Sequence, residues 1–132
     1  VLWPEPGQVY AGNNSSCVLR VSNQNHSVLL TGDIEWQAEQ ALSSKSALLK
    51  SEVLVAPHHG SRTSSSLAFV RAVQPKQVVI SSGFHNRYHF PAKSVLDRYH
   101  QAGVQTLSTA LRGAVFVSLG IVGGIRDNER LN

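Results

Sequence analysis

The stretch VLVAPHHGS, residues 53–61, carries the strongest structural signal in this chain. A short apolar run, typical of a buried strand, leads directly into a proline, two adjacent histidines and a glycine. Adjacent side chains at the end of a strand point in different directions, so one imidazole could bind a metal while the other contacts a substrate or orients the first. The alternative is a pair of polar loop histidines beside a glycine turn.

Two other apolar strands end in polar residues. Residues 28–30 (VLL) lead into Thr31-Gly32-Asp33, and residues 78–80 (VVI) lead into a loop that contains HNRYH at 85–89. The carboxyl ends of strands in layered α/β folds are where binding sites are assembled. We therefore expect the three polar ends to face a common cleft.

Asp33 has two interpretations. It could be the N-cap of the next helix and accept the backbone N–H of Glu35 or Trp36, which the Thr-Gly-Asp sequence alone favours. It could instead be a metal ligand, because the two oxygens of a carboxylate can bridge two cations. In both cases Gly32 would allow a tight turn and the close approach of another group.

The loop at 85–89 and the segment at 13–16 also have two interpretations each. The loop could place a proton donor and a phosphate-binding arginine beside a scissile bond. By itself, an ordinary surface turn is the favoured interpretation of this loop. The segment NNSS at 13–16 is either a polar turn or a set of hydrogen-bond donors that face the site.

The remaining periodicities predict alternating strands and helices after an opening hairpin, which is an α/β pattern. Predicted strands cover 16–21, 27–31, 52–56, 77–81, 104–107 and 114–119. Predicted helices follow Asp33 (inner face Ile34, Ala38, Ala41, Leu42), follow residues 64–66 (Leu67, Val70, Val73), and start at Pro91 (Ala92, Val95, Leu96, Tyr99) with an end at Gly103.

The composition excludes few functions. Twelve Lys and Arg against eight Asp and Glu give a formal charge of +4, a mild basic excess that is scattered along the 132 residues. The only cysteine, Cys17, excludes an internal disulfide and is expected to be a small buried residue. We find no signal peptide and no apolar run of the ~18 residues that a membrane-spanning helix needs.

In combination and in order, these motifs resemble the metallo-β-lactamase-like domain of the ComEC DNA-internalisation competence proteins. The matching stretches are NNSSCVLR (13–20), LLTGDIE (29–35), VLVAPHHGSRTS (53–64), NRYHFP (86–91) and GAV (113–115). The resemblance implies that residues 1–120 are the C-terminal portion of an αββα sandwich with a metal site at the strand ends. Residues 121–132 are then a polar C-terminal tail.

The resemblance also implies roles for individual residues. Asp33 and His59 would be metal ligands, with His58 the alternative to His59. In many relatives a histidine directly precedes the proline of the third loop, whereas Phe90 intervenes here. The catalytic candidates are His58, Arg87 and His89, which would contact phosphate or move protons, and the substrate-binding candidates are Asn14, Ser15, Ser61 and Asn86.

The His-x-His-x-Asp-His motif of the superfamily is absent, which leaves two or three metal ligands where a tight Zn²⁺ site uses about four. We therefore expect this chain by itself to bind Zn²⁺ or Mn²⁺ weakly, to be inactive, and to self-associate through an uncovered sheet edge or face. The resemblance implies a soluble domain of a bacterial inner-membrane protein, joined to a membrane channel, that cuts incoming DNA as a metal-dependent phosphodiesterase. A DNA-guiding module without catalysis and a small-molecule hydrolase are the alternatives.

Overall fold

A computed structural model describes residues 1–119 and 126–127. Its main sheet has five strands in the order β1-β2-β3-β4-β5. The hairpin strands β1 and β2 are antiparallel, and the other strands continue parallel to β2. The strands are β1 (Leu19–Ser22), β2 (Ser27–Leu30), β3 (Val53–Val55), β4 (Gln77–Ile80) and β5 (Gln105–Ser108).

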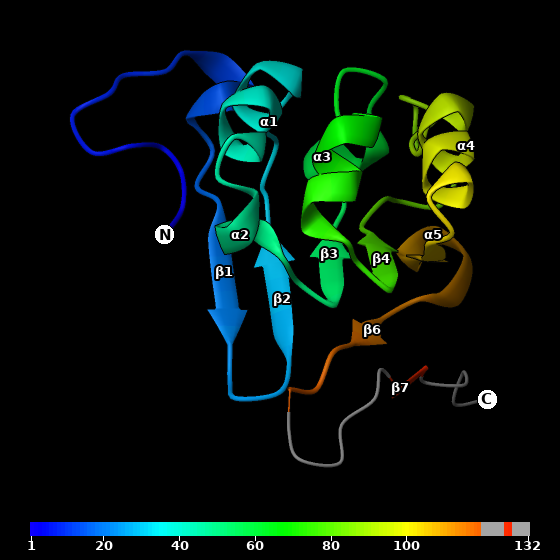
Figure 1. Ribbon diagram of the computed structural model, residues 1–132. Helices are drawn as coiled ribbons and strands as arrows, with labels where there is room; N and C mark the ends of the chain where they lie inside the picture. Colours follow the sequence, from blue (N-terminus) through cyan, green and yellow to red (C-terminus); the bar gives the residue numbers. More distant parts are fainter. Residues whose placement is uncertain (120–125, 128–132) are drawn as a thin grey trace.

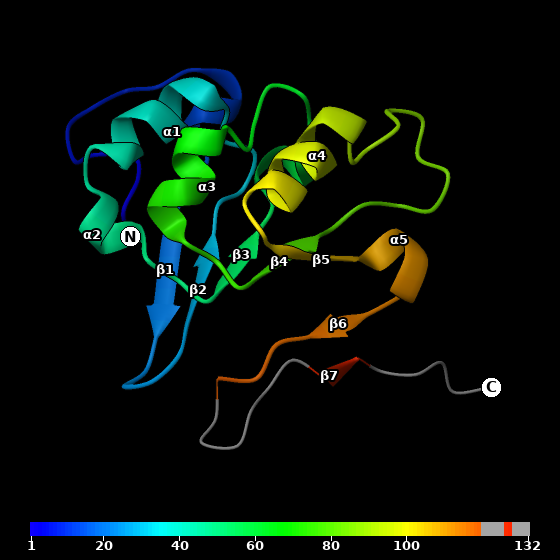
Figure 2. The same cartoon turned by 45° about the vertical axis from the view of Figure 1, so that its right-hand side comes forward.

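The helices between the strands cover one face of this sheet, while a two-stranded ribbon lies on the opposite side (Figures 1 and 2). The helices are α1 (Trp36–Ser43), α2 (Ser46–Leu49), α3 (Leu67–Val73) and α4 (Lys93–Gln101). Short 3-10 turns span Gly12–Ser15 and Pro57–Gly60, and α5 is Thr109–Arg112. The ribbon pairs β6 (Val115–Phe116) with β7 (Arg126–Asp127).

The core lies between the sheet and the helices because alternate strand residues point to that face. Leu29, Leu54 and Ile80 from the strands are fully buried there, together with Phe69 of α3 and Tyr99 of α4. This packing anchors the carboxyl ends of β2, β3 and β4, so the loops that follow them start from fixed positions.

The opposite face is also apolar, but it is covered only in part. Val28, Val53 and Val79 form a buried cluster against the segment around β6. On the hairpin, Leu19 and Leu30 remain 37% and 38% exposed. This apolar surface is the feature on which the self-association prediction rests, and that prediction is still to be tested.

The α/β class and the opening hairpin are confirmed, but several side chains differ from prediction. Cys17 is exposed, because the next residue, Val18, takes the core position beside Trp3. Ala41 is exposed and Glu39 is buried in α1, because the Glu39 carboxylate accepts backbone N–H groups at the start of α3.

Elements at the end of the chain also differ. Helix α5 was not predicted, and Pro91 lies before α4 rather than inside it. Apart from the two residues of β7, the predicted tail lies outside the described residues. Within the described part of the chain, no helix has both the length and the hydrophobicity that crossing a bilayer requires.

Candidate functional site

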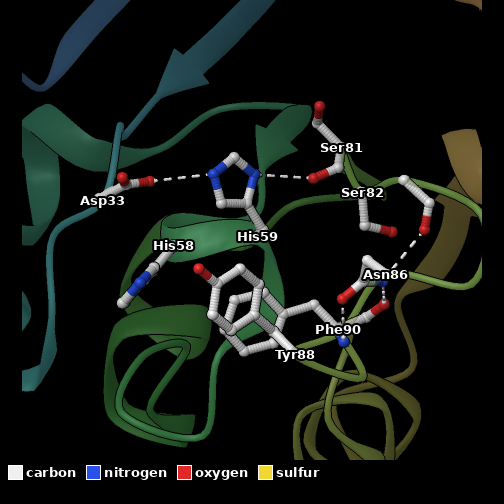
Figure 3. A pocket seen from close by; sticks show the side chains of 9 residues that line it. Asp33, His58, His59, Ser81, Ser82, Asn86, Tyr88 and Phe90 are labelled. Atoms are coloured by element: carbon white, nitrogen blue, oxygen red, sulfur yellow. Dashed lines mark hydrogen bonds and ion pairs between the residues drawn. The ribbon is translucent and has the colours of Figure 1, made fainter.

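The carboxyl ends of β2, β3 and β4 meet at a pocket of about 690 Å³ (Figure 3). We call it the Asp33 pocket. Its lining comes from the three segments that sequence patterns place at one edge of the sheet. The lining residues are Asp33, His58, His59, Ser81, Ser82, Gly83, Asn86, Tyr88 and Phe90.

Asp33 is not the cap of the helix that follows it. The N–H of Glu35 donates to Asn14 Oδ1 at 2.9 Å, and the N–H of Trp36 donates to the Thr63 carbonyl at 3.0 Å. The N-cap interpretation of Asp33 is therefore wrong. Its carboxylate is left to line the pocket.

Gly32 has the role that its position predicts. Its φ of +56° lies in the left-handed region, and an added Cβ would stand 2.8 Å from Ser16 Cβ. Ser16 approaches this closely because its Oγ accepts the N–H of Asp33 at 3.1 Å. A glycine is thus required for both the backbone conformation and the contact.

The two histidines sit on a strained turn. His58 and His59 have φ values of 47° and 55°, a left-handed conformation that is uncommon for residues with a side chain. The N–H of His58 donates to the Gly32 carbonyl at 3.0 Å, which joins the ends of β2 and β3. The imidazole planes are inclined at 65°, so the rings face different directions.

His59 lies between Asp33 and Ser81 (Figure 3). Its Nδ1 is 2.8 Å from the Ser81 carbonyl oxygen, which can only accept, so Nδ1 must carry the proton. In the neutral ring, Nε2 then presents a lone pair 3.4 Å from Asp33 Oδ1. Two acceptors that face each other at this distance could share a metal ion between them.

His58 faces a second carboxylate. Its Nδ1 is 3.3 Å from Glu35 Oε1, but no hydrogen bond joins these atoms. The hydrogen bond from the Thr63 hydroxyl to Glu35, 2.8 Å long, lowers the pKa of this carboxyl against an opposing effect of burial. A smaller contribution in the same direction comes from the charge of His58. Glu35 was missed as a site residue, although its position two residues after Asp33 was a usable signal.

Asn86 lines the Asp33 pocket, but its polar atoms hold its own loop together. Its Nδ2 donates to the carbonyls of Gly83 and Phe90 at 3.0 and 2.7 Å, and its Oδ1 accepts the N–H of Phe90 at 2.9 Å. These bonds place the Phe90 ring against both imidazoles, with centroid distances of 5.7 Å to His58 and 6.5 Å to His59. Phe90, which sequence reasoning did not select, therefore occupies the pocket wall.

The other predicted site residues lie outside the Asp33 pocket. Asn14 caps α1 and also donates to Gln37 Oε1 at 3.2 Å, and Ser15 donates to the Gly12 carbonyl at 2.7 Å. The Arg87 guanidinium lies 4.7 Å from the centroid of the Tyr88 ring.

His89 and Ser61 line a neighbouring cavity of about 540 Å³, which we call the Arg62 cavity. Its lining residues are Ser61, Arg62, Thr63, Tyr88, His89, Phe90, Ala92, Lys93 and Ser94. Of the nine predicted site residues, four thus line the Asp33 pocket, two line the Arg62 cavity, and three line neither.

The model of the metallo-β-lactamase superfamily matches residues 2–85. The chain belongs to this superfamily. The position of its pocket, at the carboxyl ends of the strands, agrees with the fold that the resemblance implies.

Within the superfamily, the predicted likeness to competence proteins is confirmed. The chain is 44% identical to Competence protein ComA of Neisseria gonorrhoeae and 37% identical to ComE operon protein 3 of Bacillus subtilis, over 86% and 87% of its residues. It is 40% identical to Recombination protein 2 of Haemophilus influenzae over 89% of its residues. These matches cover 15–16% of each relative's own length, so the chain corresponds to a small part of them.

Proposed function

We propose that this chain is part of a DNA-uptake protein, and that its Asp33 pocket hydrolyses phosphodiester bonds of the incoming DNA with a divalent metal ion. Membership of the metallo-β-lactamase superfamily supports the metal-dependent hydrolysis. Relatives named for competence support the role in DNA uptake. The proposal also places the domain in a bacterial inner-membrane protein, next to the channel portion of the same polypeptide.

One observation carries the metal assignment: His59 Nε2 and Asp33 Oδ1 face each other at 3.4 Å. The Ser81 carbonyl holds His59 by its other nitrogen, the arrangement that orients metal-binding histidines in proteins. These two atoms would hold Zn²⁺ or Mn²⁺, both of which accept carboxylate and imidazole ligands. When bound, the ion supplies a water of lowered pKa and a positive charge for the phosphoryl oxygens.

The pair is only part of a complete metal site. Among the described residues, no group of three or more His, Cys, Asp or Glu side chains is placed to hold an ion. Because a tight Zn²⁺ site uses about four ligands, the Asp33–His59 pair needs further donors. Weak metal binding and lack of activity therefore remain our expectation for this chain alone.

His58 is the candidate for handling protons and contacting phosphate. The Glu35 carboxylate lies 3.3 Å from its Nδ1, so the imidazole could pass a proton between a substrate and this carboxylate. The Thr63 hydroxyl in turn keeps Glu35 ionised. His58 would act on the substrate, and Glu35 and Thr63 would be positioning residues.

The test measures cleavage of labelled single- and double-stranded DNA by the intact protein with added Mn²⁺ or Zn²⁺. Asp33→Asn and His59→Gln are expected to reduce cleavage more than ~100-fold, because each removes a metal ligand. His100→Gln is the matched control, since this side chain is exposed on α4 and lines neither cavity.

The two alternatives give different results in the same assays. DNA binding that weakens with salt, ignores chelators and leads to no cleavage would overturn the proposal in favour of a guiding module. Metal-dependent turnover of a lactone or simple phosphodiester that DNA does not inhibit would overturn it in favour of a small-molecule hydrolase.

A further inference from the structure

We propose that the Arg62 cavity binds a second phosphate of the same single DNA strand whose neighbouring phosphodiester bond lies in the Asp33 pocket. This inference rests on the proposed function, because it assumes that the Asp33 pocket holds a phosphodiester. It assigns roles to Arg62 and Lys93, and it gives a place to His89 and Ser61, which do not line the Asp33 pocket.

The two cavities are direct neighbours. Both are lined by Tyr88 and Phe90, whose rings stack with centroids 5.5 Å apart and planes inclined by 21°. A wall of two aromatic rings therefore separates them. A chain with repeated phosphates could cross this wall and place one phosphate on each side, whereas a small substrate would fill only one cavity.

The side chains of the Arg62 cavity suit an anion. Its lining contains Arg62, Lys93 and His89, four hydroxyl groups, and no carboxylate. Within the described part of the chain, Arg62 has no ion pair and is exposed. Guanidinium, ammonium and hydroxyl groups are the usual protein contacts to the phosphates of nucleic acids. The Asp33 pocket differs because it contains a carboxylate.

Lys93 is paired with Asp97 of α4, and this pair must yield to a phosphate. Its Nζ lies 2.8 Å from Asp97 Oδ2, but the Lys93 side chain is 87% exposed, so the pair is weak. The long lysine side chain can turn from Asp97 to a phosphate in the cavity at little cost. Asp97 itself does not line the cavity.

The exposed aromatic rings favour an unpaired strand over a duplex. Tyr88 is 59% exposed at the shared wall, and Phe84 is 72% exposed in the same loop. Unpaired bases stack on exposed rings without regard to sequence, while the basic groups bind the phosphates between them. A strand bound in this way would be held next to the bond to be cut.

The test uses the intact protein with the double variant Arg62→Gln/Lys93→Gln. The control is Arg71→Gln/Lys76→Gln, which removes the same charge outside the Asp33 pocket and the Arg62 cavity. Lys76 matches Lys93 because it is 77% exposed and paired with a carboxylate, Glu52, at 2.7 Å.

The first readout is the affinity for a labelled single-stranded oligonucleotide, in chelator and over a range of salt. We expect the Arg62/Lys93 variant to bind about tenfold more weakly, and the slope of log affinity against log salt to fall by about 0.7 because one phosphate is no longer neutralised. The control should keep the wild-type slope. Equal losses in both variants, or no loss in either, would overturn the subsite.

The second readout separates binding from folding. It is the ratio of kcat/KM for an oligonucleotide with several phosphates to that for a dinucleotide with one. The Arg62/Lys93 variant should lower this ratio about tenfold, whereas a loss of folded protein would lower both terms and leave the ratio unchanged. An unchanged ratio with normal turnover overturns the subsite. Strand binding with the expected slopes but no hydrolysis of either substrate supports the subsite and overturns the proposed function.

Discussion

The capping of α1 gives the sharpest test of how the Asp33 pocket is built, because two neighbouring polar residues could perform it. In the structure Asn14 Oδ1 accepts the N–H of Glu35 at 2.9 Å, and the Asp33 carboxylate has no bond to the helix. Asn14→Ala removes this acceptor. Losing this hydrogen bond to the residue that precedes α1 costs about 1 kcal/mol of unfolding free energy, within a range of about 0.5–1.5. For a chain of this size the loss corresponds to a decrease in Tm of about 3–5 °C.

Asp33→Ala is the matched change, since alanine removes the acceptor, whereas asparagine would cap a helix as well as aspartate does. The contact of Asp33 with His59 joins two half-exposed side chains, with 44% and 49% exposure, so we expect a change within about 0.5 kcal/mol. The assay is urea and thermal unfolding of the chain in the presence of chelator, monitored by far-ultraviolet circular dichroism. If Asp33→Ala destabilises as much as Asn14→Ala, Asp33 is the cap and the reasoning fails.

Three further substitutions test contacts around the site. Gly60→Ala would place a Cβ 2.7 Å from Pro91 Cβ at a φ of +81°, so it should lower the unfolding free energy by more than about 1 kcal/mol in urea titrations. Glu39→Gln leaves one of two backbone N–H groups of the α3 turn without an acceptor, a loss of about 1–3 kcal/mol near neutral pH in the same assay. Burial raises the pKa of Glu39, so its contribution to stability is greatest below its ordinary pKa and decreases as pH rises, and the variant should remove this dependence. Thr63→Val removes the hydrogen bond that lowers the pKa of Glu35, and carboxyl titration by NMR should show that pKa rising toward its usual value.

Local patterns predicted the elements and the edge of the sheet where the pocket forms. The apolar runs before Asp33 and His58 have the length and composition of buried strands, and strand ends in this class of fold meet by geometry. This is why the convergence of these residues followed from sequence alone. The chemical roles of these residues remain predictions.

Contacts between distant residues were not predictable in the same way. Asn14 lies 21 residues from the Glu35 amide that it caps, and periodicity contains no information about such a pair. The burial of Glu39 depends on backbone groups 26 and 27 residues away. The group that orients His59 is a backbone carbonyl, which has no signature in the sequence at all.

The left-handed backbone of the turn after β3, which recurs at two histidines of the loop after β4, lowers the stability of the fold. Four of the six histidines, namely His58, His59, His85 and His89, have positive φ values. For residues with a side chain this conformation costs about 1–2 kcal/mol each, and glycine avoids the cost. Selection for heat resistance alone should therefore replace these imidazoles, whereas selection for the proposed function should retain His58 and His59 at the expense of a less robust fold.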